Sequence, residues 1–544
     1  MKKGIREIAE LCYANGIKKI VLSPGSRCAP LTIAFTEHAH LKCYQIIDER
    51  SAAFFALGLA LGSHEPVALI CTSGSAVLNY GPALAEAFYS DVPLIALTAD
   101  RPAYKIGHQD GQAINQVNVF QNFVHHSLNL NADFESDEQM WQAHTQFKNA
   151  LKDLNKGPVH VNFQFDEPLY QIADVHPEFK AEKVLFQIAN QEKALPDLSS
   201  KKIMIIAGQT EGSVELNKLI ETFEKYNQVV VVGEAISNIN AKGFIRNPNE
   251  IIRHSSVEER NALLPDIVFT FGKGIVSKIF KTWLINSDIA HYHIDLQGRE
   301  INTYKSFKDV FTEDVLHFLA RLKSELKEEI SNYKQIWNAK YQEQKEKFLQ
   351  NVEVEFSDVL AYKTCLNQLS SQSVLHAANS MSVRYVNFLE SFIPEQIQVF
   401  VNRGVSGIDG SSSTALGISV TNDKENWILT GDLAFQYDVN AFWNKYVHER
   451  VKVVVFNNSG GGIFRMIDGP QSRPNLLPHF ETPIESDAKG IALRSKMNYF
   501  RASNLEELRV GLEELKKSEK AGILEVFTNP EVNEKVYKNW ISKL

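Results

Sequence analysis

Three residues in the last third of the chain could together hold a small, hard cation. Asp432 ends a predicted strand after Gly431, and Asn458 and Gly460 lie in the turn after the next apolar run, Val451 to Phe456. Mg²⁺ prefers oxygen ligands in an octahedron and commonly shares them with a phosphate. The Asp432 carboxylate, the Asn458 amide oxygen and the Gly460 carbonyl would supply three such oxygens. The alternative is a strand–helix–strand unit whose loop ends are merely polar.

The spacing of these residues resembles the signature of thiamine-diphosphate enzymes, in which such a cation binds the diphosphate of the cofactor. A helix-like segment, Asp438 to Tyr446, lies between the two motifs. Leu433 stands where the generic signature has a second glycine. The motif therefore predicts a cofactor site in the last third of the chain, with one departure from the common pattern.

Glu49 is the candidate for activating such a cofactor. It follows a short apolar stretch, Ile46-Ile47, and begins a helical segment rich in Ala, Leu and Gly. A carboxylate beside the pyrimidine nitrogen of thiamine diphosphate favours the imino tautomer, which serves as the internal base. Two alternatives are a charge favoured by the helix dipole and a surface ion pair with Arg50. The apolar composition of Phe54 to Gly62 predicts a buried helix, which favours the functional interpretation.

Apolar strands that alternate with helical periods predict parallel sheets covered on both faces by helices. The pattern occurs three times, which indicates an α/β protein with three doubly wound parallel-sheet domains. We expect domains at 1–177, 201–347 and 358–544, with a linker of mixed charge over 178–200 and a solvated, charged helical segment over 321–347. The expected strands include Ile20–Leu22, Val67–Cys71, Leu94–Leu97, Val159–Phe163, Ile203–Ala207, Val229–Gly233 and Ile267–Gly272.

The composition is that of a folded protein of enzyme size. A chain of 544 residues is too long for one core. A net charge of −8 argues against nucleic acid as the main partner, because phosphate binding needs a basic surface. Five cysteines without a CxxC pair favour a reducing cytoplasm and speak against a disulfide framework or zinc site. The N-terminus continues into an amphipathic pattern, and no apolar run predicts a membrane span.

Seven short segments of the chain occur in the order Ser23-Pro24-Gly25-Ser26-Arg27, Asp48-Glu49-Arg50, Thr72-Ser73-Gly74, Thr98-Ala99-Asp100-Arg101-Pro102, Arg403-Gly404-Val405-Ser406-Gly407-Ile408-Asp409-Gly410, Gly431-Asp432 and Asn457-Asn458-Ser459-Gly460-Gly461-Gly462-Ile463-Phe464. Together these segments resemble one family, the 2-succinyl-5-enolpyruvyl-6-hydroxy-3-cyclohexene-1-carboxylate (SEPHCHC) synthases of menaquinone biosynthesis. The resemblance covers the first and last thirds of the chain well and the middle third weakly.

This resemblance implies a transferase that uses thiamine diphosphate and Mg²⁺, or Mn²⁺ in its place. The enzyme would decarboxylate 2-oxoglutarate on the cofactor and add the succinyl-semialdehyde carbanion to isochorismate. Glu49 matches the cofactor-activating glutamate, and Ile408 matches the apolar residue that props the cofactor in its bent shape. The residues that match the diphosphate and metal site are Gly431, Asp432, Asn458 and Gly460.

Both implied substrates are dicarboxylates, for which the planar fork of arginine is suited. Three of the matching arginines follow predicted strands, and ligands of open α/β sheets bind at the carboxyl ends of strands. Ile463 and Phe464 would form an apolar wall for the substrate ring. The matching positions are Ser26, Arg27, Arg101, Gln112, Lys278, Ser380, Arg384, Arg403, Ile463 and Phe464.

The chain also departs from the family pattern. Gly111 stands where the family often has Asn, and Ile279 stands where an Arg follows Lys278, so each departure removes a polar contact. No glycine-rich dinucleotide fingerprint follows the Ile203–Ala207 run, so we expect a middle domain without a cofactor. The superfamily places its cofactor between the first domain of one subunit and the last domain of another, which implies a homodimer or homotetramer.

Two other functions stay open on the sequence. One is another thiamine-diphosphate 2-oxo-acid decarboxylase or carboligase, although the number of arginines favours dicarboxylates over pyruvate. The other is a catalytically silent cofactor-binding or regulatory protein, against which the joint presence of Glu49, Asp432 and Asn458 argues. Release of carbon dioxide from 2-oxoglutarate would separate an enzyme from a silent protein.

Overall fold

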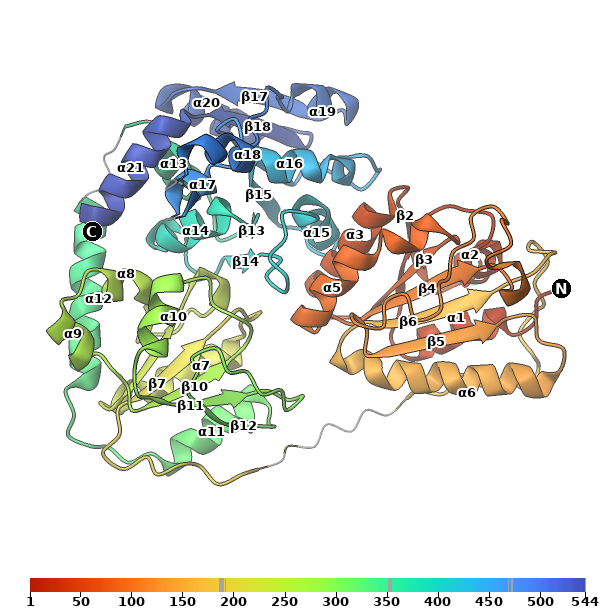
Figure 1. Cartoon of the computed structure of the whole chain (residues 1–544), viewed down its shortest axis with the longest axis horizontal. Helices are drawn as coiled ribbons and strands as arrows, with labels where there is room; N and C mark the ends of the chain where they lie inside the picture. Colours follow the sequence, from red (N-terminus) through yellow and green to blue (C-terminus); the bar gives the residue numbers. More distant parts are fainter. Residues whose placement is uncertain (185–189, 191, 351–354, 468, 471–472, 544) are drawn as a thin grey trace.

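Three six-stranded sheets form the framework of the molecule (Figure 1). The computed structural model describes the chain except residues 185–189, 191, 351–354, 468, 471–472 and 544. Neighbouring strands pair in parallel in each sheet, which confirms the α/β class with three doubly wound sheets. The domain boundaries stay a prediction, and part of the expected linker 178–200 lies outside the described residues.

The first sheet has the strand order β2-β1-β3-β4-β6-β5. Successive strand residues alternate between two core clusters: Val21 and Leu69 belong to one, and Ile20 and Ile70 to the other. The sheet is therefore buried on both faces, as continuous apolar strands predict. Its elements are α1 (Ile5–Ala14), β1 (Lys19–Leu22), α2 (Ala29–Thr36), β2 (Lys42–Gln45), α3 (Glu49–Ser63), β3 (Val67–Cys71), α4 (Ser75–Leu78), α5 (Gly81–Ser90), β4 (Leu94–Asp100), β5 (His126–Asn131), α6 (Asp137–Asp153) and β6 (Val159–Gln164).

The middle sheet has the order β12-β11-β10-β7-β8-β9, which is the order of dinucleotide-binding folds. The strand order reverses between β7 and β10, and the loops after these two strands pack tightly against each other at this point. A Cβ at Gly208 would lie 1.6 Å from the Lys273 carbonyl oxygen. Strand order alone does not assign a ligand. The elements are β7 (Ile203–Ala207), α7 (Val214–Glu221), β8 (Val229–Gly233), β9 (Phe244–Arg246), α8 (Pro248–Arg253), α9 (Val257–Ala262), β10 (Ile267–Phe271), α10 (Lys278–Ile285), β11 (Ala290–Ile294), β12 (Phe307–Phe311), α11 (Val315–Glu325) and α12 (Tyr333–Gln350).

The last sheet repeats the topology of the first, with the order β14-β13-β15-β16-β18-β17. Helices α3 and α15 are therefore equivalent elements, because each follows the second strand of its sheet. The elements are α13 (Asp358–Leu366), β13 (Ser373–Ala377), α14 (Met381–Phe388), β14 (Gln398–Phe400), α15 (Ser411–Ser419), β15 (Glu425–Gly431), α16 (Asp432–Tyr437), β16 (Val451–Asn457), α17 (Ile463–Met466), α18 (Leu477–Glu481), α19 (Lys489–Arg494), β17 (Asn498–Ala502), α20 (Leu505–Lys517), β18 (Gly522–Phe527) and α21 (Pro530–Lys543).

Helices α3 and α15 pack so closely that their backbones are in contact, and they join the first and last thirds of the chain (Figure 1). A Cβ at Gly58 would lie 2.0 Å from the Thr414 carbonyl oxygen, and one at Gly417 would lie 2.1 Å from the Phe55 carbonyl oxygen. Only glycine allows so close an approach. One core cluster runs continuously from Leu69 through Leu416 to Val453. The buried helix predicted over Phe54 to Gly62 is confirmed in α3.

Two sequence expectations about helices were wrong in their boundaries. The helix expected over Asp438 to Tyr446 is replaced by α16, which begins earlier at Asp432, and by a 3₁₀ turn at Val439–Phe442. Asp438 follows the last residue of α16 and precedes the 3₁₀ turn; it is buried and accepts hydrogen bonds from the backbone amide and the hydroxyl of Ser413. The charged segment over 321–347 is split between α11 and α12, with a break between Glu325 and Tyr333.

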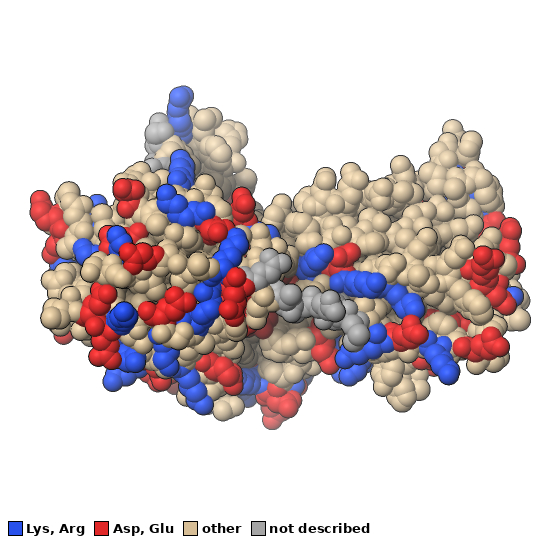
Figure 2. Space-filling view, turned by 90° about the horizontal axis from the view of Figure 1, so that it is seen from below, with Lys and Arg blue, Asp and Glu red and all other residues tan. Residues whose placement is uncertain are grey.

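Charged side chains of both signs are interspersed on the face shown in Figure 2. The same view shows a broad uncharged area over the first third of the chain, on the right of the picture. Among the described residues, no helix has the length and apolar character needed to cross a membrane.

Candidate functional site

The loops after β15 and β16 bring Asp432, Asn458 and Gly460 together at the carboxyl edge of the last sheet. Asp432 is buried, and its carboxylate accepts hydrogen bonds from the Gly460 amide at 2.8 Å and the Leu433 amide at 2.7 Å. Burial raises the pKa of Asp432 to about 7, because desolvation disfavours the charged form more than the two amides favour it. The site therefore holds a carboxylate that a cation would stabilise.

Asn458 offers an oxygen that the protein leaves without a partner. Its amide nitrogen donates to Asp358 at 3.0 Å, and this bond fixes the orientation of the amide. Its Oδ1 is buried and has no hydrogen-bond partner within the described part of the chain. A buried unsatisfied acceptor is costly unless a ligand completes it. The donor set of carboxylate, amide oxygen and backbone carbonyl fits the hard-oxygen preference of Mg²⁺.

Two glycines at this edge have different surroundings: Gly460 packs closely against protein backbone, and Gly431 borders open space. Gly460 has φ of 144°, which favours glycine, and a Cβ there would lie 2.6 Å from the Glu481 carbonyl oxygen. A Cβ at Gly431 would meet open space. These residues fit the diphosphate and metal site that the sequence predicts for them, and that assignment is still a prediction.

Glu49 begins α3, directly after the N-cap residue Asp48. The Asp48 carboxylate accepts from the Ser51 amide at 2.9 Å and from the Asn440 side chain at 2.8 Å, which ties the start of α3 to the last third. Burial raises the pKa of Glu49, and the nearby charge of Asp48 raises it further. A raised pKa suits a carboxyl group that exchanges a proton with a cofactor nitrogen.

Arg50 contacts Tyr437 of the last third, whereas the ion-pair alternative requires it to contact Glu49. Its guanidinium donates to the Tyr437 carbonyl at 2.6 Å and lies over the Tyr437 ring at 4.7 Å. Tyr437 is the last residue of α16, and Asp432 is the first. A six-residue helix is about 9 Å long, so the start of α3 and the predicted metal site lie at opposite ends of one short helix.

The loop from Arg403 to Gly410 is held by a buried glutamate of the first third. Glu86, on α5, accepts from the Gly404 amide at 2.6 Å and the Val405 amide at 2.8 Å. Gly410, with φ of 71°, lies so close to the Phe54 ring that a Cβ would fall within 2.1 Å of it. Ile408 is 38% exposed, so it is not a core residue, and its proposed role under the cofactor stays a prediction.

Sequence reasoning missed Glu86 and Asp358. Glu86 was visible as a lone acid in the apolar helix Ala83-Leu84-Ala85-Glu86-Ala87, a position where an unpaired charge would be costly. Asp358 carried no comparable signal, because a single acid at a helix start is common.

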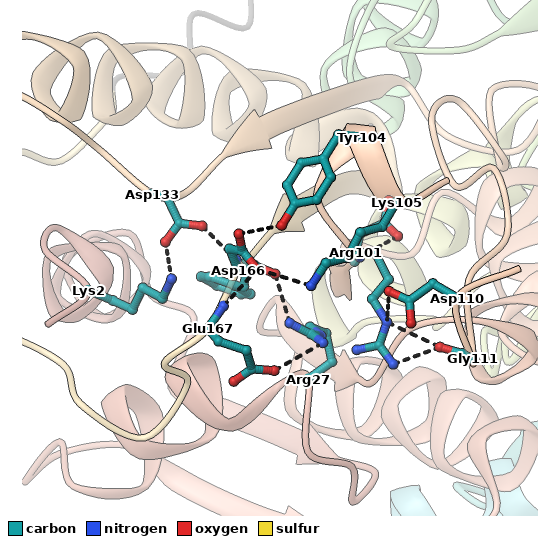
Figure 3. A network of polar contacts seen from close by, with 12 residues as sticks. Lys2, Arg27, Arg101, Tyr104, Lys105, Asp110, Gly111, Asp133, Asp166 and Glu167 are labelled. Carbon is teal, nitrogen blue, oxygen red and sulfur yellow. Dashed lines mark hydrogen bonds and ion pairs between the residues drawn. The ribbon is translucent and has the colours of Figure 1, made fainter. Parts of the chain in front are cut away.

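Two of the predicted substrate-binding arginines, Arg27 and Arg101, lie close together in the first third (Figure 3). Burial lowers the pKa of Arg27, and the nearby charge of Arg101 lowers it further. Ser26 is exposed beside Arg27, and Gln112 lies exposed in the loop that follows Arg101, with φ of 56°. All four follow β1 or β4 in the chain, and the two arginines come after these strands as the sequence predicts; their role as substrate ligands stays a prediction.

A second pair, Arg384 and Arg403, lies in the last third. Arg384 donates to the Ser380 carbonyl at 2.5 Å, and Arg403 donates to the Asn379 side chain at 2.9 Å. Burial lowers the pKa of Arg403, and the charge of Arg384 lowers it further. Lys278 is exposed at the start of α10 and lines, with Arg384, a cavity of about 590 Å³ between the middle and last sheets.

Ile463 and Phe464 begin the short helix α17 and are half-buried. The Phe464 ring lies 5.5 Å from that of Phe480, and Ile463 packs against the core of the last third. The structure thus puts an apolar surface directly after the Gly460 turn, while contact with a substrate ring stays a prediction.

Comparison with known families shows the class of enzyme to which the chain belongs. Residues 2–122 match the family described as thiamine pyrophosphate enzyme, N-terminal TPP binding domain. Residues 384–526 match the family described as thiamine pyrophosphate enzyme, C-terminal TPP binding domain. The chain is therefore a thiamine-pyrophosphate enzyme, with one cofactor-binding unit at each end of the chain.

Full-length relatives narrow the class to one family. A 2-succinyl-5-enolpyruvyl-6-hydroxy-3-cyclohexene-1-carboxylate synthase of Flavobacterium johnsoniae is 39% identical over 99% of this chain and 98% of its own length. Proteins of the same name from Flavobacterium psychrophilum and Bacteroides thetaiotaomicron are 38% and 33% identical, over 99% and 100% of this chain and 98% and 99% of their own. The chain belongs to this synthase family, which confirms the resemblance seen in its motifs.

Proposed function

We propose that this chain is a SEPHCHC synthase of menaquinone biosynthesis, a transferase that decarboxylates 2-oxoglutarate and joins the remaining four-carbon unit to isochorismate. The names of its full-length relatives support this activity. The observation that carries the proposal is the convergence of Asp432, Asn458 and Gly460 at one sheet edge, linked through α16 to the start of α3. We place the reaction in the cytoplasm.

Thiamine diphosphate, when bound, supplies the carbon that attacks the 2-oxo group and holds the electron pair left by carbon dioxide. Asp432, the Asn458 amide oxygen and the Gly460 carbonyl would hold Mg²⁺ against its diphosphate. Glu49 would share a proton with its pyrimidine nitrogen, and its raised pKa keeps that proton available. Ile408 would support the cofactor from the loop that Glu86 holds.

The arginines would then bind the substrates. Arg27 and Arg101, with Ser26 and Gln112, would take the carboxylates of isochorismate at the edge of the first sheet. Arg384 and Arg403, with Ser380, would line the other side of the site, and Lys278 would extend the cationic surface from α10. Pairs of neighbouring guanidinium groups favour dicarboxylates, since each pair can bind two negative charges.

A mass-spectrometric product assay tests the proposal. The protein is mixed with thiamine diphosphate, Mg²⁺, 2-oxoglutarate and isochorismate, beside Glu49→Gln and the control Glu37→Gln, an exposed glutamate paired with Arg6 at 2.6 Å. We expect an adduct of both substrates less carbon dioxide from the wild type and the control, and a loss of about 100-fold or more in Glu49→Gln. Carbon dioxide release without the adduct would move the assignment to a decarboxylase, and no turnover would refute it.

We also propose a homodimer or homotetramer with the site at a subunit interface. One chain already brings Asp48 to Asn440, so a shared site requires that these contacts be exchanged between two chains. Mixing Glu49→Gln with Asp432→Asn distinguishes the arrangements. If the site is shared, random pairing leaves one intact site in half of the dimers, and about a quarter of wild-type activity returns. If each chain completes its own site, no activity returns.

A further inference from the structure

Arg27 is a buried cation whose donors are only partly used. The residue is 5% exposed, and its Nη1 donates to the Phe165 carbonyl at 2.9 Å. Its Nη2 lies 3.3 Å from a carboxylate oxygen of Glu167, while its Nε is buried without a hydrogen-bond partner (Figure 3). Glu167 itself is 61% exposed. The carboxylate that faces Arg27 is therefore free to move into solvent, whereas the guanidinium is not.

Arg101 is likewise occupied by an acceptor of the chain. Its Nε and Nη2 donate to the Gly111 carbonyl oxygen at 3.1 and 2.7 Å, and its Nε lies 3.7 Å from Asp110 (Figure 3). A carbonyl that accepts two N–H groups from one guanidinium satisfies the same donors that a bidentate carboxylate would. Both arginines therefore bind acceptor groups of the chain itself, at the positions where the proposed function requires them to bind substrate carboxylates.

Asp166, the neighbour of Glu167, fixes the segment that follows Arg101. Its carboxylate accepts from the Tyr104 hydroxyl at 2.7 Å and from Lys105 at 3.1 Å (Figure 3). Its backbone amide donates to Asp133 at 2.6 Å, and Asp133 pairs with the buried Lys2. Asp166 is therefore anchored to the core of the first third, and through it the segment after β4 is anchored too.

We propose that Asp166 and Glu167 are positioning residues for the substrate arginines: Asp166 anchors the segment after Arg101, and Glu167 competes with a substrate carboxylate for Arg27. This inference rests on the proposed function and adds a specificity device to it. The device discriminates by charge, because only an anion that offers Arg27 more than the single ion pair with Glu167 displaces that side chain. A neutral ligand would leave the pair intact.

The two adjacent acids should have opposite effects on binding. Glu167→Gln removes the competitor, so the KM for isochorismate should fall by about two- to fivefold, the range expected for a partly exposed ion pair. Asp166→Asn releases Tyr104 and Lys105, so the same KM should rise by about three- to tenfold. The kcat and the KM for 2-oxoglutarate should change little in either variant. A general loss of stability would lower activity in both variants and could not produce opposite signs.

The experiment is steady-state kinetics of the holoenzyme, with isochorismate varied at saturating 2-oxoglutarate and with 2-oxoglutarate varied at saturating isochorismate. Tyr104→Phe tests the Asp166 contact without altering a charge and should raise the KM in the same direction as Asp166→Asn. The matched control is Glu182→Gln, an exposed glutamate paired with Lys148 at 2.8 Å, which should leave the KM unchanged.

The outcomes separate this inference from the proposed function. If the wild type makes the adduct and Glu167→Gln shows an unchanged or higher KM, the competition is refuted while the activity stands. If Tyr104→Phe and Asp166→Asn both leave the KM unchanged, the anchoring role is refuted. If the wild type makes no adduct, the proposed function falls, and this inference falls with it.

Discussion

Substitution of Gly58 by alanine tests whether the close contact between α3 and α15 holds the two halves of the site in place. Gly58 lies inside α3, and a Cβ there would lie 2.0 Å from the Thr414 carbonyl oxygen and 3.0 Å from the Gly417 Cα. Both neighbours are backbone atoms, which cannot turn away as a flexible side chain could. The two helices must therefore separate by about 1 Å to restore an ordinary contact.

The size of the effect follows from two opposing terms. Alanine favours a helix over glycine by about 1 kcal/mol, whereas overpacking costs about 1–3 kcal/mol and lies at the upper end against rigid backbone. We expect a net loss of about 2 kcal/mol, or a fall of about 4–8 °C in the melting temperature of the unit that contains the contact. The affinity for thiamine diphosphate should also fall, because α3 carries Glu49 and α15 follows the Ile408 loop.

Gly490→Ala is the matched control. Gly490 is exposed and lies inside α19, and a Cβ there would meet no atom within 4 Å. The same substitution should therefore be neutral or stabilising by up to about 1 kcal/mol. Thermal unfolding followed by circular dichroism, together with titration of thiamine diphosphate, measures both effects. If Gly58→Ala melts at or above the wild-type temperature, the close packing of α3 on α15 is wrong.

Three further predictions concern the cofactor site. Because Asp432 has a pKa of about 7 and must be ionised to bind a cation, the midpoint of a Mg²⁺ titration at saturating thiamine diphosphate should be about tenfold higher at pH 6 than at pH 8; equal midpoints would contradict this. A carboxyl group whose pKa is higher in the folded state favours folding while protonated, so this contribution to the stability of the metal-free protein should be lost as the pH rises through about 7. Glu86→Gln removes one of two charge-assisted acceptors for the Gly404 and Val405 amides, so the Kd for thiamine diphosphate should rise by about 10-fold. Burial raises the pKa of Glu86, so the neutral side chain avoids a desolvation cost, and the melting temperature should change little; a Kd within twofold of the wild type would exclude a role for Glu86 in holding the loop.

The strands, and the polar residues that follow them, could be predicted because both depend on local sequence patterns. Val67–Cys71, Ile203–Ala207 and Val229–Gly233 are apolar runs of strand length, and the structure has strands with the same bounds. The motif around Asp432 and Asn458 could be found for the same reason, since parallel strands put their carboxyl ends at one edge. The helix expected over Asp438 to Tyr446 was misplaced because Asp438 lies between α16 and a 3₁₀ turn, where its carboxylate contacts Ser413, 25 positions earlier in the chain.

The sequence by itself determined the class of fold, the family and the residue types available for chemistry. Those properties follow from the periodicity of apolar residues and from short motifs, which need no knowledge of distant contacts. Only the tertiary structure decided which polar groups have partners. It leaves the Asn458 side-chain oxygen without a hydrogen-bond partner, lets Glu86 accept from the backbone of the loop before Ile408, and pairs Arg27 with Glu167. Each depends on burial and on partners more than 90 positions away in the chain, and local sequence patterns carry no information about either.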